Sequence, residues 1–253
     1  MARSILDREL RELNVQIQQL GSLVAEALGK ALDALKMGDL AAASLVIESD
    51  TVIDNLRTKV EEHTIRLLTL QQPLGGRDLR YLTSTLAIAS DLERSGDGAE
   101  GIAQILLRML PLQGGIKCFN SEFPSSNQSQ FAEVAAIRSI LELGQEASRV
   151  LQGTMKAFAS LDAKAARYIW EEDDVVDVRY HLVRHDLMAM LSGVHAIPAL
   201  QHDTLALQRA TYLLWIAHKL ERIGDHSTNI CERIVFIVEG ETAMPGVGAQ
   251  ETV

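Results

Sequence analysis

A short acidic stretch occurs twice in this chain of 253 residues, and the duplication limits what the chain can fold into. Residues 92–97 read LERSGD, and residues 220–225, which follow 128 positions later, read LERIGD. When residues 86–103 are aligned with residues 214–231, 9 of the 18 positions are identical. Because shared composition rarely produces such agreement, the sequence predicts two structural units of the same design.

Apolar residues at helical spacing run through both units. Glycines and prolines divide the pattern into six expected helices, over residues 4–37, 39–71, 78–110, 130–160, 162–191 and 204–239. Asp39 follows Gly38 as Asp162 follows Leu161, and both aspartates are good helix N-caps. Only 4% of the residues are aromatic, which favours helix packing over a β-sandwich or barrel. We therefore predict an all-α fold of two tandem, pseudo-symmetric, antiparallel three-helix bundles.

Two segments lack the helical periodicity. Residues 113–129 contain the glycines, serines and proline that are typical of a linker. We therefore place the first bundle at residues 1–112 and the second at residues 130–240. Residues 241–253, which are rich in Gly, Thr and Ala, are expected to form a flexible C-terminal tail.

Each unit carries two pairs of acidic residues spaced four positions apart. The pairs are Asp50/Asp54 and Glu93/Asp97 in the first unit, and Asp173/Asp177 and Glu221/Asp225 in the second. Side chains at i and i+4 share one helix face, where two like charges repel. The acids also continue a line of apolar residues, such as Leu214 and Ala217 before Glu221. Gly96 and Gly224 precede the last acids and are expected to let the helices approach or to admit a ligand.

These duplicated carboxylates predict metal sites, because a cation between the acids would offset their repulsion. Oxygen ligands favour Mg²⁺, Ca²⁺ or Mn²⁺, and carboxylates also bridge iron. The sequence does not choose among these metals. The competing interpretation is a metal-free helical scaffold, in which the acids are solvated and pair with Arg94 and Arg222.

His181 and His185 provide a second spacing of interest. They lie four positions apart and resemble a zinc-binding pair, so zinc is a further candidate. The matched residues of the first unit are Thr58 and Glu62, so the duplication does not support a zinc site there.

The other polar candidates are assigned no chemistry. His226 and Asn229 follow Asp225 and are expected to be exposed polar residues; the alternative is that they contact the metal ligands. Cys118 and Cys231 form no C-x-x-C pair, which indicates a reducing compartment.

Charge and hydropathy exclude several classes of partner. The formal net charge is −10 and no basic stripe stands out, so nucleic acid is not expected to bind. No apolar run reaches the roughly 18 residues of a membrane span. Residues 1–9 carry charges where a signal peptide has an apolar run, so we expect a cytoplasmic protein. The chain also lacks the nucleophile-elbow and phosphate-loop motifs of common enzymes.

Several short segments match one known family. In chain order they are residues 7–10 (DREL), 21–24 (GSLV), 71–73 (QQP), 77–80 (RDLR), 209–217 (RATYLLWIA), 220–226 (LERIGDH) and 229–230 (NI). The chain thereby resembles the PhoU family, accessory and regulatory proteins of bacterial phosphate transport. The resemblance implies two three-helix bundles whose E/D-x-x-x-D pairs bind metal ions or multinuclear clusters. By position, these ligands are Asp50, Asp54, Glu93, Asp97, Asp173, Asp177, Glu221 and Asp225.

The resemblance also implies a regulator and not an enzyme. Family members couple the phosphate-specific ABC transporter to a sensor histidine kinase, and they restrain both uptake and the starvation response. The expected partners are therefore the transporter ATPase subunit, the kinase and a second copy of the chain in a homodimer. The alternative from another class is a ferritin-like di-iron oxidoreductase. Such enzymes use Glu-x-x-His pairs on a four-helix bundle, and none of the acid pairs here has a histidine at i+3.

Overall fold

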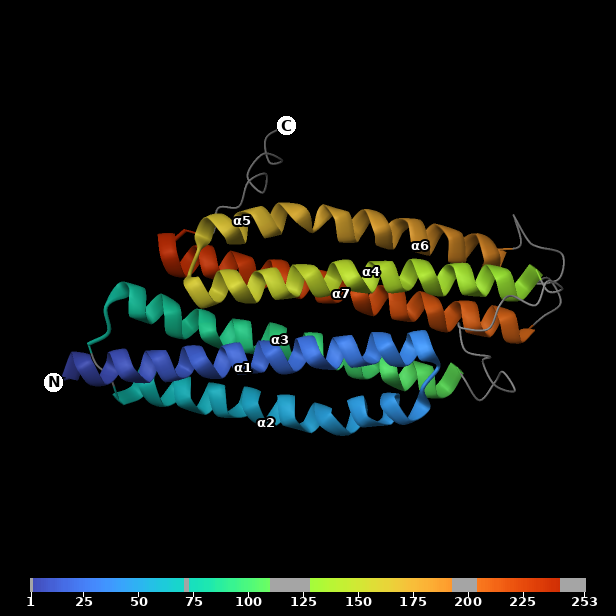
Figure 1. Ribbon diagram of the computed structural model, residues 1–253. Coiled ribbons are helices and arrows are strands. Elements are labelled where there is room, and N and C mark those ends of the chain that lie inside the picture. The colour runs from blue at the N-terminus through green and yellow to red at the C-terminus, as the bar shows by residue number, and fades with distance from the viewer. Residues whose placement is uncertain (1, 71–72, 110–127, 193–203, 242–253) are drawn as a thin grey trace, which may run out of the picture.

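Figure 1 shows the computed structural model, which describes residues 2–70, 73–109, 128–192 and 204–241. All regular structure in these ranges is helical. The helices are α1 (Ala2–Met37), α2 (Leu40–Leu70), α3 (Gly76–Met109), α4 (Gln128–Ser160), α5 (Ala163–Glu172), α6 (Asp174–Ser192) and α7 (Thr204–Glu239). The all-α prediction is confirmed. None of the helices described is long and apolar enough to cross a membrane.

The helices form two bundles that lie side by side (Figure 1). In the first bundle, α1, α2 and α3 contact one another, and in the second, α4 and the α5–α6 segment pack on α7. Within each bundle, successive helices run antiparallel, as predicted, when α5 and α6 are taken as one segment. Most of the expected linker, residues 113–127, and residues 242–253 of the expected tail lie outside the described ranges.

The fifth expected helix is divided in two at Asp173. The amide of Asp173 donates to the Trp170 carbonyl at 3.4 Å, and the amide of Val176 donates to the Asp173 carbonyl at 2.8 Å. Both bonds join residues three positions apart, so the chain tightens for one turn before the α-helical pattern resumes. Figure 1 shows α5 and α6 following one line along the outer side of the second bundle. The division therefore places one predicted metal ligand at a local irregularity.

Matched caps begin the second helix of each unit. The carboxylate of Asp39 accepts from the amides of Ala41 and Ala42 at 2.9 and 3.0 Å. Asp162 accepts from the amides of Lys164 and Ala165 at 3.0 Å each. Both N-caps predicted from the sequence are confirmed.

The turns before these caps use the left-handed backbone region. Gly38 has φ of +66°, and Leu161, its match in the second unit, has φ of +49°. Glycine enters this region without steric penalty, whereas leucine does so at a cost. Leu161 also packs against the core, and this contact offsets the strain.

The two bundles share one hydrophobic core, and α3 and α7 form the most extensive contact between them. The crossing of α1 and α4 shows the internal symmetry directly. A Cβ at Gly21 would lie 2.5 Å from Met155 Cε, and a Cβ at Gly144 would lie 2.5 Å from Leu32 Cδ2. Gly144 and Met155 are the matches of Gly21 and Leu32, so each helix places a large side chain over the partner's glycine.

Candidate metal centres

The structure brings three predicted acids together in each bundle. In the first cluster, Asp50 and Asp54 of α2 meet Asp97 of α3. In the second cluster, Asp173 and Asp177 meet Asp225 of α7. Within each cluster, one carboxylate oxygen per residue lies within 4.8 Å of the others. The i, i+4 spacing thus supplies two ligands, and the neighbouring helix supplies the third.

Glu93 and Glu221 lie outside these two sets of three but remain electrostatic neighbours. Glu93 contributes to the raised pKa of Asp50, and Asp177 contributes to the raised pKa of Glu221. Glu221 Oε2 lies 3.1 Å from His218 Nδ1. The predicted four-acid sites therefore consist of three close aspartates with a glutamate beside them.

The acids lie at the edge of the apolar stripe, which differs from the expectation that they continue it. Asp173 is buried, with 9% of its surface exposed. Asp54, Asp97 and Asp225, in contrast, are exposed. Each cluster therefore reaches solvent on one side, where an ion can enter without a conformational change.

Gly224 allows the close approach of the second cluster's helices. A Cβ at this position would lie 2.8 Å from Asp173 Oδ1 and 3.2 Å from Val176 Cγ1. At the matched Gly96, a Cβ would lie 3.2 Å from Ile53 Cδ1 and 3.6 Å from Asp50 Oδ1. Of the two roles expected for these glycines, the geometry supports helix approach.

Burial and mutual repulsion keep protons on the second cluster. Burial, together with the charges of Asp177 and Asp225, raises the pKa of Asp173 to about 7. Burial and the charge of Asp225 also raise the pKa of Asp177 and of Glu221. At neutral pH the cluster therefore holds negative charge at an energetic cost, which a bound cation would relieve.

The first cluster shows the same pattern in a weaker form. Burial raises the pKa of Asp50 to about 6, with further contributions from Glu100 and Asp54. Burial and the charge of Asp97 raise the pKa of Glu93. The difference between the clusters follows from exposure, since Asp50 is half-buried and Asp173 is buried.

A second observation, besides its negative charge, suits the second cluster to a metal ion. Asp173 Oδ1 is buried and forms no hydrogen bond within the described residues. A buried carboxylate oxygen normally has a partner, because water cannot solvate it. In the described ranges no ion pair joins the clustered aspartates to Arg94 or Arg222. The charges of Arg57 and Arg94 do act on Glu93, whose pKa is raised mainly by burial, so the metal-free scaffold stays an alternative for the first cluster. Three carboxylates and no nitrogen or sulfur suit a hard cation.

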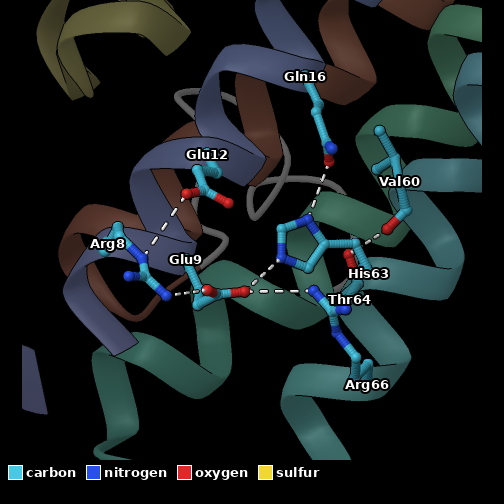
Figure 2. Close-up of polar contacts among 8 residues, drawn as sticks. All are labelled: Arg8, Glu9, Glu12, Gln16, Val60, His63, Thr64 and Arg66. Carbon is cyan, nitrogen blue, oxygen red and sulfur yellow. Dashed lines mark hydrogen bonds and ion pairs between the residues drawn. The ribbon is translucent and has the colours of Figure 1, made fainter. Parts of the chain in front are cut away.

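A third group, which sequence reasoning missed, joins α1 to α2 (Figure 2). His63 is buried, with its Nε2 3.2 Å from Glu9 Oε2 and its Nδ1 3.0 Å from Gln16 Oε1. Arg8 and Arg66 donate to the same Glu9 carboxylate. Glu12 completes three groups with metal-ligand chemistry within 4.8 Å. Because both histidine nitrogens and the Glu9 carboxylate have protein partners, the group is a satisfied link between helices. Because no local spacing connects residues 54 positions apart, this group could not be predicted from sequence.

The histidines of the sequence analysis divide into two kinds. His181 and His185 are exposed, and His185 Nδ1 lies 3.3 Å from Asp186 Oδ1. Neither histidine belongs to a ligand group among the residues described. The expectation that His226 is exposed is wrong. It is buried, with 6% of its surface exposed, and its Nδ1 lies 3.1 Å from Asp91 Oδ1 of the other bundle.

The remaining expectations in this region concern Asn229 and the cysteines. Asn229 is exposed, as expected, and its Nδ2 also donates to Asp91 at 3.4 Å. Cys231 is buried against Thr154, and burial raises the pKa of its thiol to about 12, so it is unreactive. Cys118 lies outside the described residues.

Comparisons with known proteins match the whole of this architecture. The PhoU domain matches residues 17–106 and 140–234, ranges that contain the first and second clusters respectively. The phosphate-specific transport system accessory protein PhoU homolog of Clostridium acetobutylicum is 27% identical, over 95% of this chain and 97% of that protein. The homolog of Streptococcus pneumoniae serotype 4 is 30% identical, over 94% of this chain and 97% of that protein.

Solved structures agree with these sequence matches. The crystal structure of the phosphate transport system regulatory protein PhoU from Streptococcus pneumoniae superposes with a TM-score of 0.75, at 28% identity, over 94% of this chain and 99% of that one. PhoU from Pseudomonas aeruginosa gives the same TM-score at 27% identity, over 93% and 99%. The sequence match and the shared fold extend over both bundles, and the chain therefore belongs to the PhoU family.

Proposed function

We propose that this protein regulates phosphate uptake and the phosphate-starvation response, and that it couples the phosphate ABC transporter to a sensor histidine kinase. The observation that carries the proposal is a family match that includes both bundles and both aspartate clusters. The similar proteins are named as accessory or regulatory proteins of phosphate transport. This naming supports a regulatory role without an enzymatic one. We also propose that the protein forms a homodimer. Light scattering after gel filtration would measure the mass of the particle and test this.

Metal binding is the second part of the proposal. A cation in the first cluster would join α2 to α3, and one in the second would join the α5–α6 junction to α7. Each metal would thus tie together two helices of one bundle. The unpartnered Asp173 oxygen and the raised pKa of Asp50 and Asp173 support this assignment. Magnesium, manganese, calcium and iron suit such all-oxygen sets.

Association with the transporter is tested by co-purification. The tagged chain is recovered from cells grown in high and in low phosphate, and the transporter ATPase and the sensor kinase are quantified with it. We expect both partners, in amounts that change with phosphate. Deletion of the gene should raise the output of a phosphate-starvation reporter in high phosphate. Recovery of neither partner in either medium would contradict the proposed coupling.

Metal content is tested by elemental analysis of the purified protein. We expect stoichiometric metal that falls by about one site in Asp97→Asn and in Asp225→Asn, because each substitution removes one ligand of one cluster. Asp33→Asn is the matched control, since it removes the same charge from an exposed site on α1. Equal metal in all four proteins would show that the clusters bind none. Oxygen-dependent turnover of the bound metal would instead support the di-iron oxidoreductase.

A further inference from the structure

A pocket of about 490 Å³ lies between the two bundles, where α3 faces α7. Its lining residues are Arg94, Asp97 and Gly98 of α3 together with Lys219, Arg222 and His226 of α7. No apolar side chain is among them. The volume is in the range that holds small-molecule ligands. Because the lining has no apolar side chain, we expect a polar ligand.

The lining is cationic in an otherwise acidic chain. Three basic side chains and one carboxylate give it a charge of +2, against a formal net charge of −10 for the whole chain. Arg94, Lys219 and Arg222 form no ion pair or side-chain hydrogen bond within the described residues. Arg149 and Arg167, in contrast, each bind a glutamate. Arg94 and Arg222 are exposed, and the charge of Arg94 also acts on the neighbouring Glu93. The three cations still repel one another, and an anion between them would reduce that repulsion.

The symmetry of the repeat places two of these cations opposite each other. Arg94 and Arg222 are matched residues of the duplicated stretch, so they approach the pocket from the two bundles. The third cation depends on a difference between the repeats. Lys219 lies against Gly101 of α3, where a Cβ would overlap its Cε and Nζ atoms. Because Gly101 leaves this space, the lysine can lie across the interface at the edge of the pocket.

His226 adds a contact of a different type. Its Nδ1 is 3.1 Å from Asp91 Oδ1, and because a carboxylate only accepts, Nδ1 carries the hydrogen. Nε2 forms no hydrogen bond within the described residues, and in the neutral ring it accepts one. Hydrogen phosphate carries both oxygens that accept from arginine and a hydroxyl that can donate to Nε2. Sulfate at neutral pH has no such hydroxyl.

We propose that this pocket binds a phosphate-type oxyanion, held by Arg94, Lys219 and Arg222. Asp97 belongs both to the pocket and to the first cluster. A metal ion in that cluster would offset the negative charge beside the anion, so metal and anion strengthen each other's binding. Anion binding by this pocket does not depend on the proposed function. The further idea that the bound anion is the phosphate signal for the regulator rests on that function.

Calorimetric titration of the purified full-length protein in a chelator, at fixed ionic strength, tests the pocket. Inorganic phosphate and tripolyphosphate are titrated separately, which distinguishes free phosphate from a longer phosphate chain. We expect saturable binding of at least one of them, weakened about tenfold or more in the double variant Arg94→Gln/Arg222→Gln. Lys164→Gln, an exposed change on α5, is the charge control and should bind like the wild type. Circular dichroism confirms that each variant is folded. Binding of neither anion, or equal binding by the double variant, would overturn the proposal.

Asp97→Asn tests whether basic side chains hold the anion without a metal ion. In the chelated protein, the substitution removes the carboxylate from the pocket, so phosphate should bind more tightly. Asp33→Asn, which removes the same charge from an exposed site on α1, should leave phosphate binding unchanged. Weaker phosphate binding by Asp97→Asn in the chelator would overturn the proposal, because loss of a carboxylate cannot weaken an anion site made of basic side chains. Equal binding of sulfate would overturn the role of His226. Absence of anion binding would leave the co-purification with transporter and kinase unaffected, so the two proposals fail separately.

Discussion

Asp173 combines three unfavourable conditions at one side chain. It interrupts the helical hydrogen bonds between α5 and α6, it is buried against Gly224, and one of its oxygens has no partner among the described residues. A carboxylate under these conditions favours its protonated form, which accounts for the raised pKa. Ionisation of Asp173 near neutral pH therefore lowers the free energy of unfolding of the metal-free protein.

This gives a pH dependence with a defined sign. The pKa of Asp173 is about 7 in the folded protein and about 3.9 in an unfolded chain. Between these values the folded state binds more protons, so the free energy of unfolding decreases as pH rises from about 4 to about 7. Asp50 acts in the same direction up to about pH 6. Thermal unfolding in a chelator should thus show a falling midpoint, and Asp173→Asn should flatten the fall.

The measurement compares midpoints at pH 5, 6, 7 and 8 for the wild type, Asp173→Asn and the exposed control Asp33→Asn. At pH 8 we expect Asp173→Asn to be the more stable by about 1–3 kcal/mol, or several degrees. Added Mg²⁺ or Mn²⁺ should reverse that order, because only the wild type keeps the full ligand set. An Asp173→Asn profile parallel to the wild-type profile would refute this account.

Gly224 provides a steric test of the same site. Gly224→Ala should lower the free energy of unfolding by about 1–3 kcal/mol, because its Cβ would lie 2.8 Å from Asp173 Oδ1. Gly29→Ala is the matched control, since no atom lies within 4 Å of its added Cβ. That change should stabilise α1 by about 0.5–1 kcal/mol through helix propensity. Urea unfolding measures both, and a stabilising Gly224→Ala would contradict the close approach.

At the scale of the elements, the sequence predicts most helices well and some details poorly. Glycine and aspartate mark the turn between α1 and α2 by a local mechanism, so the boundary at residues 37–39 follows from sequence. The division at Asp173 does not, because the residues around it keep an uninterrupted helical pattern and only Asp173 lies outside the two helices. The left-handed conformation of Leu161 also cannot be predicted from the sequence, since side-chain packing stabilises a conformation that leucine alone disfavours.

The two N-caps give a prediction at this scale. Asp39→Ala and Asp162→Ala should each lower the free energy of unfolding by about 1 kcal/mol, because each leaves two helix amides without an acceptor. The caps belong to different bundles, so the double variant should lose the sum of the two. Chemical denaturation with an unchanged m-value is the measurement. A loss confined to one variant would show that the two units are not capped equivalently.

At the scale of the whole molecule, the repeat predicts the two bundles but not how they join. Local spacing placed the aspartates in pairs, and the duplication indicated which pairs share a site. The link from His226 to Asp91 spans 135 positions and has no equivalent within the repeat, because the match of His226 is Gly98. A residue whose partner lies on the other bundle therefore looks, in the sequence, like any polar residue near a helix end.

A double-mutant cycle tests this link. His226→Leu should cost about 1–3 kcal/mol, because it leaves the buried Asp91 carboxylate with only the longer bond from Asn229. Asp91→Leu should also destabilise the protein, and the double variant should cost less than the sum by about 1 kcal/mol or more. Chemical denaturation supplies the four values. Strict additivity would show that the two side chains are near each other without interacting.

The residue that matches Asp91 in the second unit is Lys219, and this reversal of charge gives each half of the chain a preference for the other. Two copies of the first half, docked through α3, would set each Asp91 against the Gly98 and Gly101 surface, with no imidazole or amide to receive it. Two copies of the second half would set Lys219 against His226 and Asn229, which fill the space that Gly101 leaves open. These complementary differences between the repeats thus favour contact between the first and second halves over contact between two identical halves. The two halves of the chain are therefore no longer interchangeable. Each side of the interface carries side chains that suit the other half and not a second copy of itself.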